Sequence, residues 1–199
     1  METLVESREY ETGVIEIHQD LHPENPREMW DHAGTMCSDN RQFLLKYRIE
    51  ADCPPNLRQM ALGIGGMALP MTRGQDGIWW AGKARSGDAT DDPDAWIYMD
   101  SETARKEGFV HKDGRYAGKI DWKRVEACLR AEVEEYSHYC SGEVYGFVAK
   151  ARGLDGEFVE IHSVWGFYCE PEEIYEDAKG ELPKADPNRE FDLAEAMAA

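Results

Sequence analysis

Apolar residues recur at three- and four-residue steps between Asp121 and Cys140, which is the spacing of one face of an α-helix. The recurring positions are Val125, Cys128, Leu129, Val133, Tyr136 and Cys140. Charged residues occupy the opposite face. Asp121 suits the N-cap of such a helix, and Gly142 suits the left-handed conformation that often ends one. The pattern therefore predicts one long helix over about residues 121–140.

After this helix the chain changes to strand composition. Residues 143–149 and 157–165 are rich in β-branched and aromatic residues. Leu154, Asp155 and Gly156 lie between the two runs and supply the Asp-Gly chemistry of a tight turn. The pattern predicts an antiparallel hairpin, with the long helix packed on the sheet that contains it.

Shorter elements are expected before the long helix. Residues 12–19 alternate apolar and polar side chains, as a strand with one wet face does. Asn25 and Pro26 mark a helix start, residues 96–99 read WIYM as a short strand, and Asp100 or Ser101 can cap a short helix. Residues 41–49 fit a strand or a helix, and residues 52–94 predict no clear element. We expect a single α+β domain over residues 12–168, an antiparallel sheet with short helices beside the long one, after a flexible N-terminus at 1–11.

The last part of the chain is strongly acidic. Residues 169–199 hold ten acidic residues and three basic ones. Such a run is usually solvated. It predicts an acidic C-terminal tail, in which residues 192–199 are a candidate short helix.

Composition limits the classes of partner. The chain has 199 residues, with 22 Lys and Arg against 40 Asp and Glu, a net charge of −18. The hydrophobic share of 42% is enough for a globular core. Because the excess charge is negative, direct binding of nucleic acid and of anionic membranes is disfavoured, and basic protein surfaces are favoured partners.

The cysteines and the N-terminus bear on the compartment. The five cysteines are odd in number and none forms a C-x-x-C pair. They are typical of reduced thiols in an intracellular protein. Residues 1–11 have no apolar core of the signal-peptide kind, and no run reaches the ~20 apolar residues of a membrane span. We therefore expect a soluble cytoplasmic protein.

No pattern predicts a cofactor or a metal. Gly63, Gly65 and Gly66 lack the spacing of a dinucleotide or phosphate loop. His18 and His22 lie close to Asp20 and could suggest a metal site, but strand alternation already accounts for His18 as an exposed residue. Neither a metal nor a cofactor is expected.

Several segments resemble a family of uncharacterised bacteriophage and plasmid proteins. They are NPREMWDHAGTM at 25–36, WIYMDSETARKEG at 96–108, LRAEVEEYSHYCSGEVYGF at 129–147 and VWGFY at 164–168. The chain departs from the family pattern at Met29, which is inserted in the first motif, at residues 162–164, where the family tends to have Asp-Ser-Cys, and in its glycine-rich residues 54–90. The resemblance implies a phage or mobile-element setting and no particular reaction.

The favoured function is that of a small acidic accessory protein that binds and inhibits a basic host protein. Anti-restriction or anti-CRISPR inhibition by acidic mimicry would fit, because carboxylates can compete with nucleic-acid phosphates for Lys and Arg. The residues assigned to binding are Trp79, Trp80, Glu134, Glu135, Trp165, Tyr168, Glu170, Glu172 and Glu173.

Two alternatives remain open at this point. The first is an enzyme with an acid-base site near the 143–165 hairpin, because a carboxylate beside an imidazole is common equipment for proton transfer. Its candidate residues are Glu143, Tyr145, Glu160, His162 and His138. The second is an interaction protein of the phage particle or replication apparatus, acting through Trp165, Phe167 and Tyr168. The sequence does not indicate an oligomeric state.

Overall fold

The computed structural model describes residues 3–29, 31–40, 52–73, 79–82, 93, 95–153 and 156–184. The chain divides into two compact units. The terminal unit combines both ends of the chain, Met1–Glu24 and Gly142–Ala199, and the central unit is Asn25–Ser141. This division differs from the expected single domain over 12–168.

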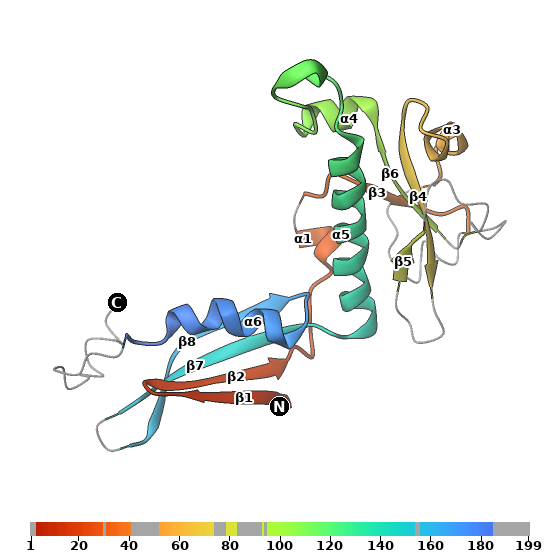
Figure 1. The fold of residues 1–199 in the computed structure, drawn as a ribbon. Helices are drawn as coiled ribbons and strands as arrows, with labels where there is room; N and C mark the ends of the chain where they lie inside the picture. Colours follow the sequence, from red (N-terminus) through yellow and green to blue (C-terminus); the bar gives the residue numbers. More distant parts are fainter. Residues whose placement is uncertain are drawn as a thin grey trace. The chain divides into compact units, whose positions relative to one another are not determined.

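The terminal unit contains a four-stranded antiparallel sheet with the strand order β1-β2-β7-β8 (Figure 1). Its elements are β1 (Thr3–Tyr10), β2 (Gly13–Gln19), β7 (Tyr145–Arg152), β8 (Phe158–Phe167), α6 (Pro171–Ala178) and a short 3₁₀ turn at Lys179–Glu181. The predicted strand at 12–19 and the predicted hairpin at 143–165 are thus confirmed.

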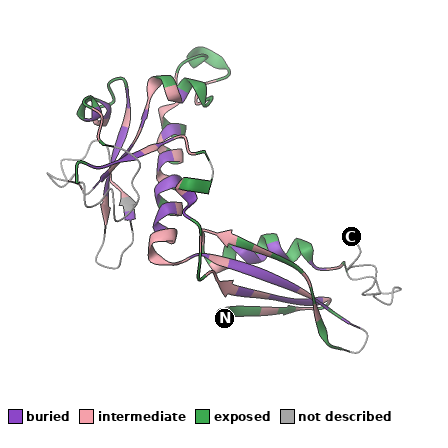
Figure 2. Ribbon diagram, turned by 180° about the vertical axis from the view of Figure 1, so that it is seen from behind, coloured by how far each residue is buried: buried purple, intermediate pink, exposed green. Residues whose placement is uncertain are grey.

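Strand alternation fixes which face of this sheet is covered. Ile15 and Ile17 of β2 are fully buried and lie opposite Ala149 and Phe147 of β7. Helix α6 packs on the same face through Ile174, Tyr175 and Ala178. Figure 2 shows the resulting line of buried residues along β2 and β7.

The central unit contains a second antiparallel sheet with the order β3-β6-β4-β5. Its strands are β3 (Thr35–Cys37), β4 (Gly66–Arg73), β5 (Trp79–Ala81) and β6 (Ala95–Asp100). Its helices are α1 (Pro26–Met29), α3 (Leu57–Ala61), α4 (Ser101–Lys106) and α5 (Trp122–Ser141), with a 3₁₀ turn at Gly114–Tyr116. The predicted cap is present, because Asp100 Oδ1 accepts the Thr103 amide at 2.7 Å.

Helix α5 packs on one face of this second sheet. Val125, Leu129, Val133 and Tyr136 are buried against a core that includes Leu69, Ile97 and Met99. Leu57 and Met60 of α3 cover the other face. The α+β class and the long helix on an antiparallel sheet are confirmed. The sheet beneath α5 is the one formed by β3, β6, β4 and β5 of the central unit, whereas the hairpin belongs to the terminal unit.

Parts of the N-terminal and C-terminal segments form regular elements that the sequence does not predict. Residues 3–10 form β1, an edge strand paired to β2, where a flexible N-terminus was expected. Residues 171–178 of the expected tail form α6. Each of these segments buries few side chains and is therefore rich in polar residues. Such a composition is also typical of a solvated, unstructured segment, which is why the sequence did not predict these elements. The candidate helix at 192–199 lies outside the described residues.

Two of the five cysteines lie close together in the central unit. The Sγ atoms of Cys37 and Cys53 are 3.1 Å apart, about 1 Å longer than the S–S bond of a disulfide. We expect glutathione disulfide to oxidise this pair, with one cysteine forming a mixed disulfide and the other displacing glutathione. Burial raises the pKa of Cys53, so the reaction should be slow at neutral pH and faster in mild alkali.

Mass spectrometry and thiol titration in denaturant should then show two fewer thiols and the loss of two hydrogen atoms. The Cys53→Ser variant should keep all of its thiols. Five titratable thiols in the treated wild type would show that the two sulfur atoms do not meet.

Candidate functional site

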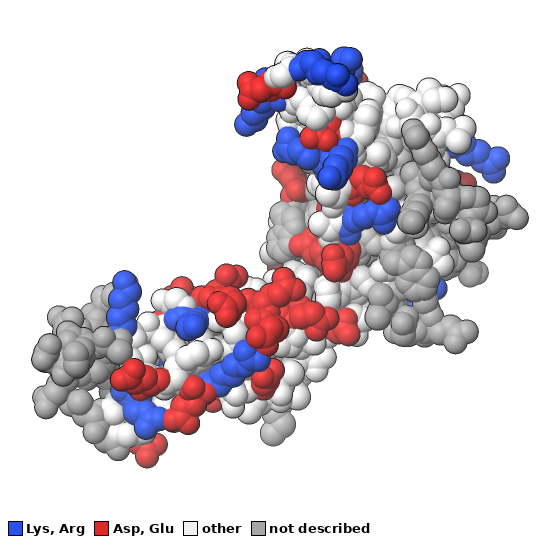
Figure 3. Space-filling view, in the orientation of Figure 1, with Lys and Arg blue, Asp and Glu red and all other residues white. Residues whose placement is uncertain are grey.

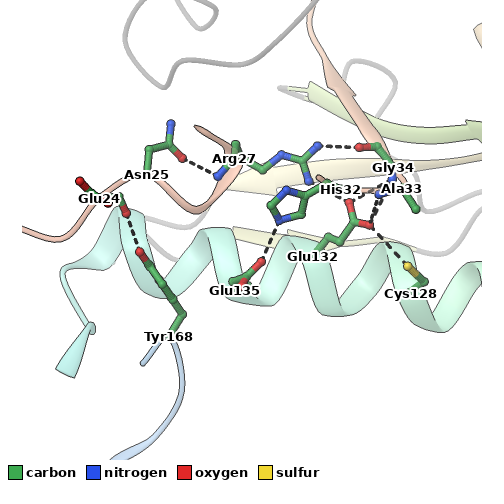
Figure 4. A network of polar contacts seen from close by, with 10 residues as sticks. All are labelled: Glu24, Asn25, Arg27, His32, Ala33, Gly34, Cys128, Glu132, Glu135 and Tyr168. Carbon is green, nitrogen blue, oxygen red and sulfur yellow. Dashed lines mark hydrogen bonds and ion pairs between the residues drawn. The ribbon is translucent and has the colours of Figure 1, made fainter. Parts of the chain in front are cut away.

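A buried ion pair joins α1 to α5 in the central unit (Figure 4). The guanidinium of Arg27 donates to Glu132 Oε2 at 2.8 Å, and the two side chains are only 2% and 11% exposed. Arg27 also donates to the carbonyl of Gly34 at 2.5 Å. Asn25 Oδ1 accepts the Arg27 amide at 3.1 Å, as the predicted helix start requires.

Glu132 accepts further hydrogen bonds from backbone and thiol. The amides of Ala33 and Gly34 donate to it at 3.0 and 3.1 Å, and the Cys128 thiol donates at 3.4 Å. These donors occupy both oxygens of the Glu132 carboxylate. Glu132 therefore fixes the 25–34 segment to α5.

Cys128 is not suited to nucleophilic chemistry. Burial, together with the neighbouring Glu132 carboxylate, raises its pKa to about 11. Reactive cysteines need the opposite shift, because the thiolate is the nucleophile. The segments 25–36 and 129–140, both part of the family resemblance, thus meet in a structural network.

Helix α5 also carries two of the predicted binding residues. Glu135 Oε2 lies 3.0 Å from Nε2 of His32 in the same network, and Glu134 is exposed. Glu134 is thus available to a partner, whereas Glu135 already holds a neighbouring segment.

The two adjacent tryptophans lie on β5 of the central unit. Trp79 is 2% exposed, its ring contacts Tyr136, and its amide donates to Ser137 Oγ at 2.8 Å. The assignment of Trp79 to binding is therefore wrong, because the ring is part of the core. Trp80 pairs with Thr72 through the backbone, and its side chain lies outside the described residues.

Acidic residues are concentrated in the terminal unit. It holds 21 acidic and 6 basic residues, a net charge of −15, whereas the central unit holds 19 and 16, a net charge of −3. Nearly all of the excess negative charge thus belongs to one unit.

Helix α6 presents much of this charge on a continuous surface. Its apolar residues face the sheet, and exposed carboxylates lie on its outer side and at its two ends (Figure 3). We call this surface the acidic face, and it consists of Glu170, Glu172, Glu173, Glu176, Asp177 and Glu181. Glu172 is paired with Arg8 at 2.5 Å. Glu173, Glu176 and Asp177 have no ion-pair partner among the described residues.

The predicted binding residues Glu170, Glu172 and Glu173 therefore lie together, next to Tyr168, whose hydroxyl donates to the Glu24 carbonyl at 2.6 Å. Glu176 and Asp177 were missed. Their spacing of four residues from Glu172 and Glu173 could have placed them on the same side of a helix.

Trp165 lies on the opposite face of the terminal sheet. It is 37% exposed, and its ring covers Gly146, where an added Cβ would be only 2.3 Å from Cε3. The ring also contacts His18, with centroids 6.2 Å apart. His18 Nε2 lies 3.1 Å from Glu16, which also accepts a hydrogen bond from Lys150 at 2.7 Å. This polar cluster was not predicted, because β2 and β7 are far apart in sequence.

Glu16 predicts a pH dependence of stability. Burial alone would raise its pKa, but the hydrogen bonds from Lys150 and His18 outweigh burial and hold the pKa below its usual value. A carboxylate whose pKa is lowered in the folded state stabilises the protein above about pH 4.5. This stabilisation is lost as the pH falls through the pKa of the folded state. We expect the Glu16→Gln variant to be less stable at pH 7 and to lose less stability between pH 5 and 3.

Urea unfolding followed by circular dichroism at several pH values measures this difference. The exposed Glu11→Gln variant, which removes the same charge, is the control and should behave as the wild type. Equal acid sensitivity in the wild type and the Glu16→Gln variant would contradict the assigned role.

Two of the acid-base residues suggested for the hairpin, Glu160 and His162, lie on different faces of the terminal sheet. A bulge in β8 pairs Ala149 with His162 but Lys150 with Glu160. The His162 ring contacts Phe147 on the α6 side of the sheet, whereas Glu160 lies on the other side. Glu143 and Tyr145 belong to the terminal unit, and His138 belongs to α5 of the central unit. Simple strand alternation would place Glu160 and His162 on one face, and the bulge is the reason that they lie on different faces.

Among the described residues, no group of three or more His, Cys, Asp or Glu side chains could hold a metal ion, and no helix is long and apolar enough to cross a membrane. The chain matches no protein-family model, no curated protein and no solved structure.

Proposed function

We propose that the protein is a binding protein whose terminal unit docks on a basic surface of another protein. The observation that carries the proposal is the charge of that unit, −15 of a total of −18. Charge of one sign on one unit steers an oppositely charged partner and sets the orientation of docking. A chain whose carboxylates served only solubility would not need this separation.

The acidic face is the part of the terminal unit best suited to contact. Ile174, Tyr175 and Ala178 anchor α6 to the sheet, so the outward carboxylates are held on a rigid support. Side chains one helical turn apart lie about 5–6 Å from one another. The carboxylates thus form a group of closely spaced negative charges on one helix, of which Glu172 is paired with Arg8.

The partner class follows from this charge pattern. Clusters of Lys and Arg that accept closely spaced negative groups are typical of proteins that handle nucleic acid. A protein that occupies such a cluster would compete with the nucleic acid and inhibit the partner. Host defence factors that cleave or bind foreign nucleic acid are the favoured targets, in keeping with the phage resemblance.

The test is affinity capture from a bacterial lysate on the immobilised full-length protein. A docked basic partner should be retained at 50 mM NaCl, released progressively as the salt concentration rises to 500 mM, and displaced by added duplex DNA or RNA. Retention that is insensitive to both salt and nucleic acid would contradict electrostatic docking. If no protein is retained at 50 mM NaCl, the proposal of a host partner in that lysate is contradicted.

A further inference from the structure

The central unit carries a surface of the opposite sign. Seven of the chain's 22 Lys and Arg residues fall between α4 and the start of α5, and all seven are exposed. We call this surface the basic cap. It consists of Arg105, Lys106, Lys112, Arg115, Lys119, Lys123 and Arg124. Figure 3 shows several basic side chains, with acidic ones among them, around the segment that joins α4 to α5.

The basic cap is built on an ordered support. Val110 pairs with Ile120 in an isolated bridge, and the amides of His111 and Asp121 donate to the carbonyls of Lys119 and Phe109 at 2.9 and 2.8 Å. The intervening loop therefore projects as a hairpin with Lys112, Arg115 and Lys119 on it. Gly118 adopts a φ of 76°, which lets the chain turn back toward the second arm.

The charges of the basic cap are only partly neutralised: Lys106 pairs with Glu107 at 3.8 Å, and the exposed Asp113 lies on the same hairpin. Lys112, Lys119 and Lys123 have no ion-pair partner among the described residues. Lys123 and Arg124 also lie in the first turn of α5, which has no acidic residue. Cations are disfavoured at that end of a helix, although the Arg124 guanidinium lies 5.5 Å from the centre of the Phe109 ring.

An exposed aromatic ring lies among these cations. Tyr116 is 45% exposed. The Arg115 guanidinium lies 4.6 Å from the centre of the ring, and Lys119 Nζ lies 5.6 Å from it. An aromatic ring flanked by cations offers stacking for a base and charge for the adjoining phosphates, as in proteins that bind single-stranded nucleic acid.

We propose that the basic cap binds single-stranded nucleic acid, with Lys112 and Lys119 contacting phosphates and Tyr116 stacking on a base. This goes beyond docking of the terminal unit on a basic protein. It also revises the expectation, drawn from the total charge, that nucleic acid is not bound directly. Because charges are screened over about 8 Å at physiological ionic strength, a local positive surface can act despite the net charge of the chain.

Fluorescence anisotropy with a labelled 20-nucleotide oligothymidylate tests this binding on the full-length protein. The Lys112→Gln/Lys119→Gln variant should bind about tenfold or more weakly at 50 mM NaCl, and the slope of log affinity against log salt should become shallower by about 1.4, which corresponds to two lost contacts on a single strand. The matched control is Lys179→Gln/Lys184→Gln, which removes the same charge from exposed positions of the terminal unit and should bind as the wild type does.

Tyr116 separates base stacking from charge alone. Tyr116→Ala should weaken binding about fivefold or more, and Tyr116→Phe should retain it. Circular dichroism of each variant reports whether the fold is kept. The proposal is overturned if the wild type does not bind the oligonucleotide at 50 mM NaCl, if the control double variant loses as much affinity as the cap variant, or if Tyr116→Ala binds normally.

One further outcome would assign the basic cap to a different partner. If sedimentation shows self-association that the cap double variant abolishes, while the oligonucleotide is not bound, the cap contacts the acidic face of a second copy. These variants leave every carboxylate of the terminal unit in place. A negative result with the oligonucleotide therefore rejects only nucleic-acid binding by the basic cap and leaves the proposed docking of the terminal unit on a basic protein untouched.

Discussion

Replacing Glu132 with alanine is expected to lower the free energy of unfolding by about 3–5 kcal/mol, the usual effect of removing one partner from a buried ion pair. The Arg27 side chain, which is only 2% exposed, would lose its ion pair with Glu132. The amides of Ala33 and Gly34 would also lose their acceptor. Chemical denaturation followed by circular dichroism measures the change.

The Glu134→Ala variant is the matched control, because it removes an exposed carboxylate from the same helix and should change stability by less than about 0.5 kcal/mol. A double-mutant cycle with Arg27→Met should show that the two substitutions together cost less than the sum of their separate effects. A small effect of Glu132→Ala would show that the network does not hold the 25–34 segment on α5.

Replacing Ile174 with alanine is the second large effect that we expect. Ile174 is fully buried between α6 and the terminal sheet, and truncating such a residue costs about 2–5 kcal/mol. The consequence should concentrate in the terminal unit, where α6 would lose its main anchor. Hydrogen exchange measured by mass spectrometry should show faster exchange over residues 171–178.

Glu173→Ala, on the outer side of the same helix, serves as the control for helix content, and its exchange should match that of the wild type. Protection of α6 that survives the Ile174→Ala substitution would contradict the view that apolar burial holds the acidic face in place.

Local patterns predicted the elements that bury a clear face. The spacing of Val125, Leu129 and Val133 predicted α5, and the alternation around Ile15 and Ile17 predicted β2. In both cases one side of the element lies in a core and the other in water, so the hydrophobic period is strong.

The remaining features depend on contacts between distant segments. The sheet that packs against α5 in the central unit is built from residues 35–100, and no local pattern carries that information. Tryptophan is a residue type that often anchors interfaces, yet Trp79 lies in the core beside Tyr136. The bulge between Glu160 and His162 also arises from pairing with β7. In each case tertiary contacts decide the outcome, and the local sequence pattern does not specify those contacts.

The distribution of charge also could not be predicted from the sequence alone. A total of −18 describes neither unit well, because the terminal unit carries most of it and the central unit is close to neutral. The terminal unit joins residues 1–24 to residues 142–199, so this separation becomes visible only once the chain is folded. The average also conceals the basic cap.

The acidic face can be tested by neutralising three of its unpaired carboxylates. The test variant is Glu173→Gln/Glu176→Gln/Asp177→Asn. The control variant, Glu102→Gln/Glu107→Gln/Asp113→Asn, removes the same charge from exposed positions of the central unit. Both variants have a net charge of −15, so only the position of the charge differs.

The measurement is the affinity of each variant for the captured basic partner at 150 mM NaCl. The test variant should bind about tenfold or more weakly, an effect of about 1.4 kcal/mol in binding free energy, and the control should stay within about twofold of the wild type. Equal affinities for the wild type, the test variant and the control would contradict docking through the acidic face.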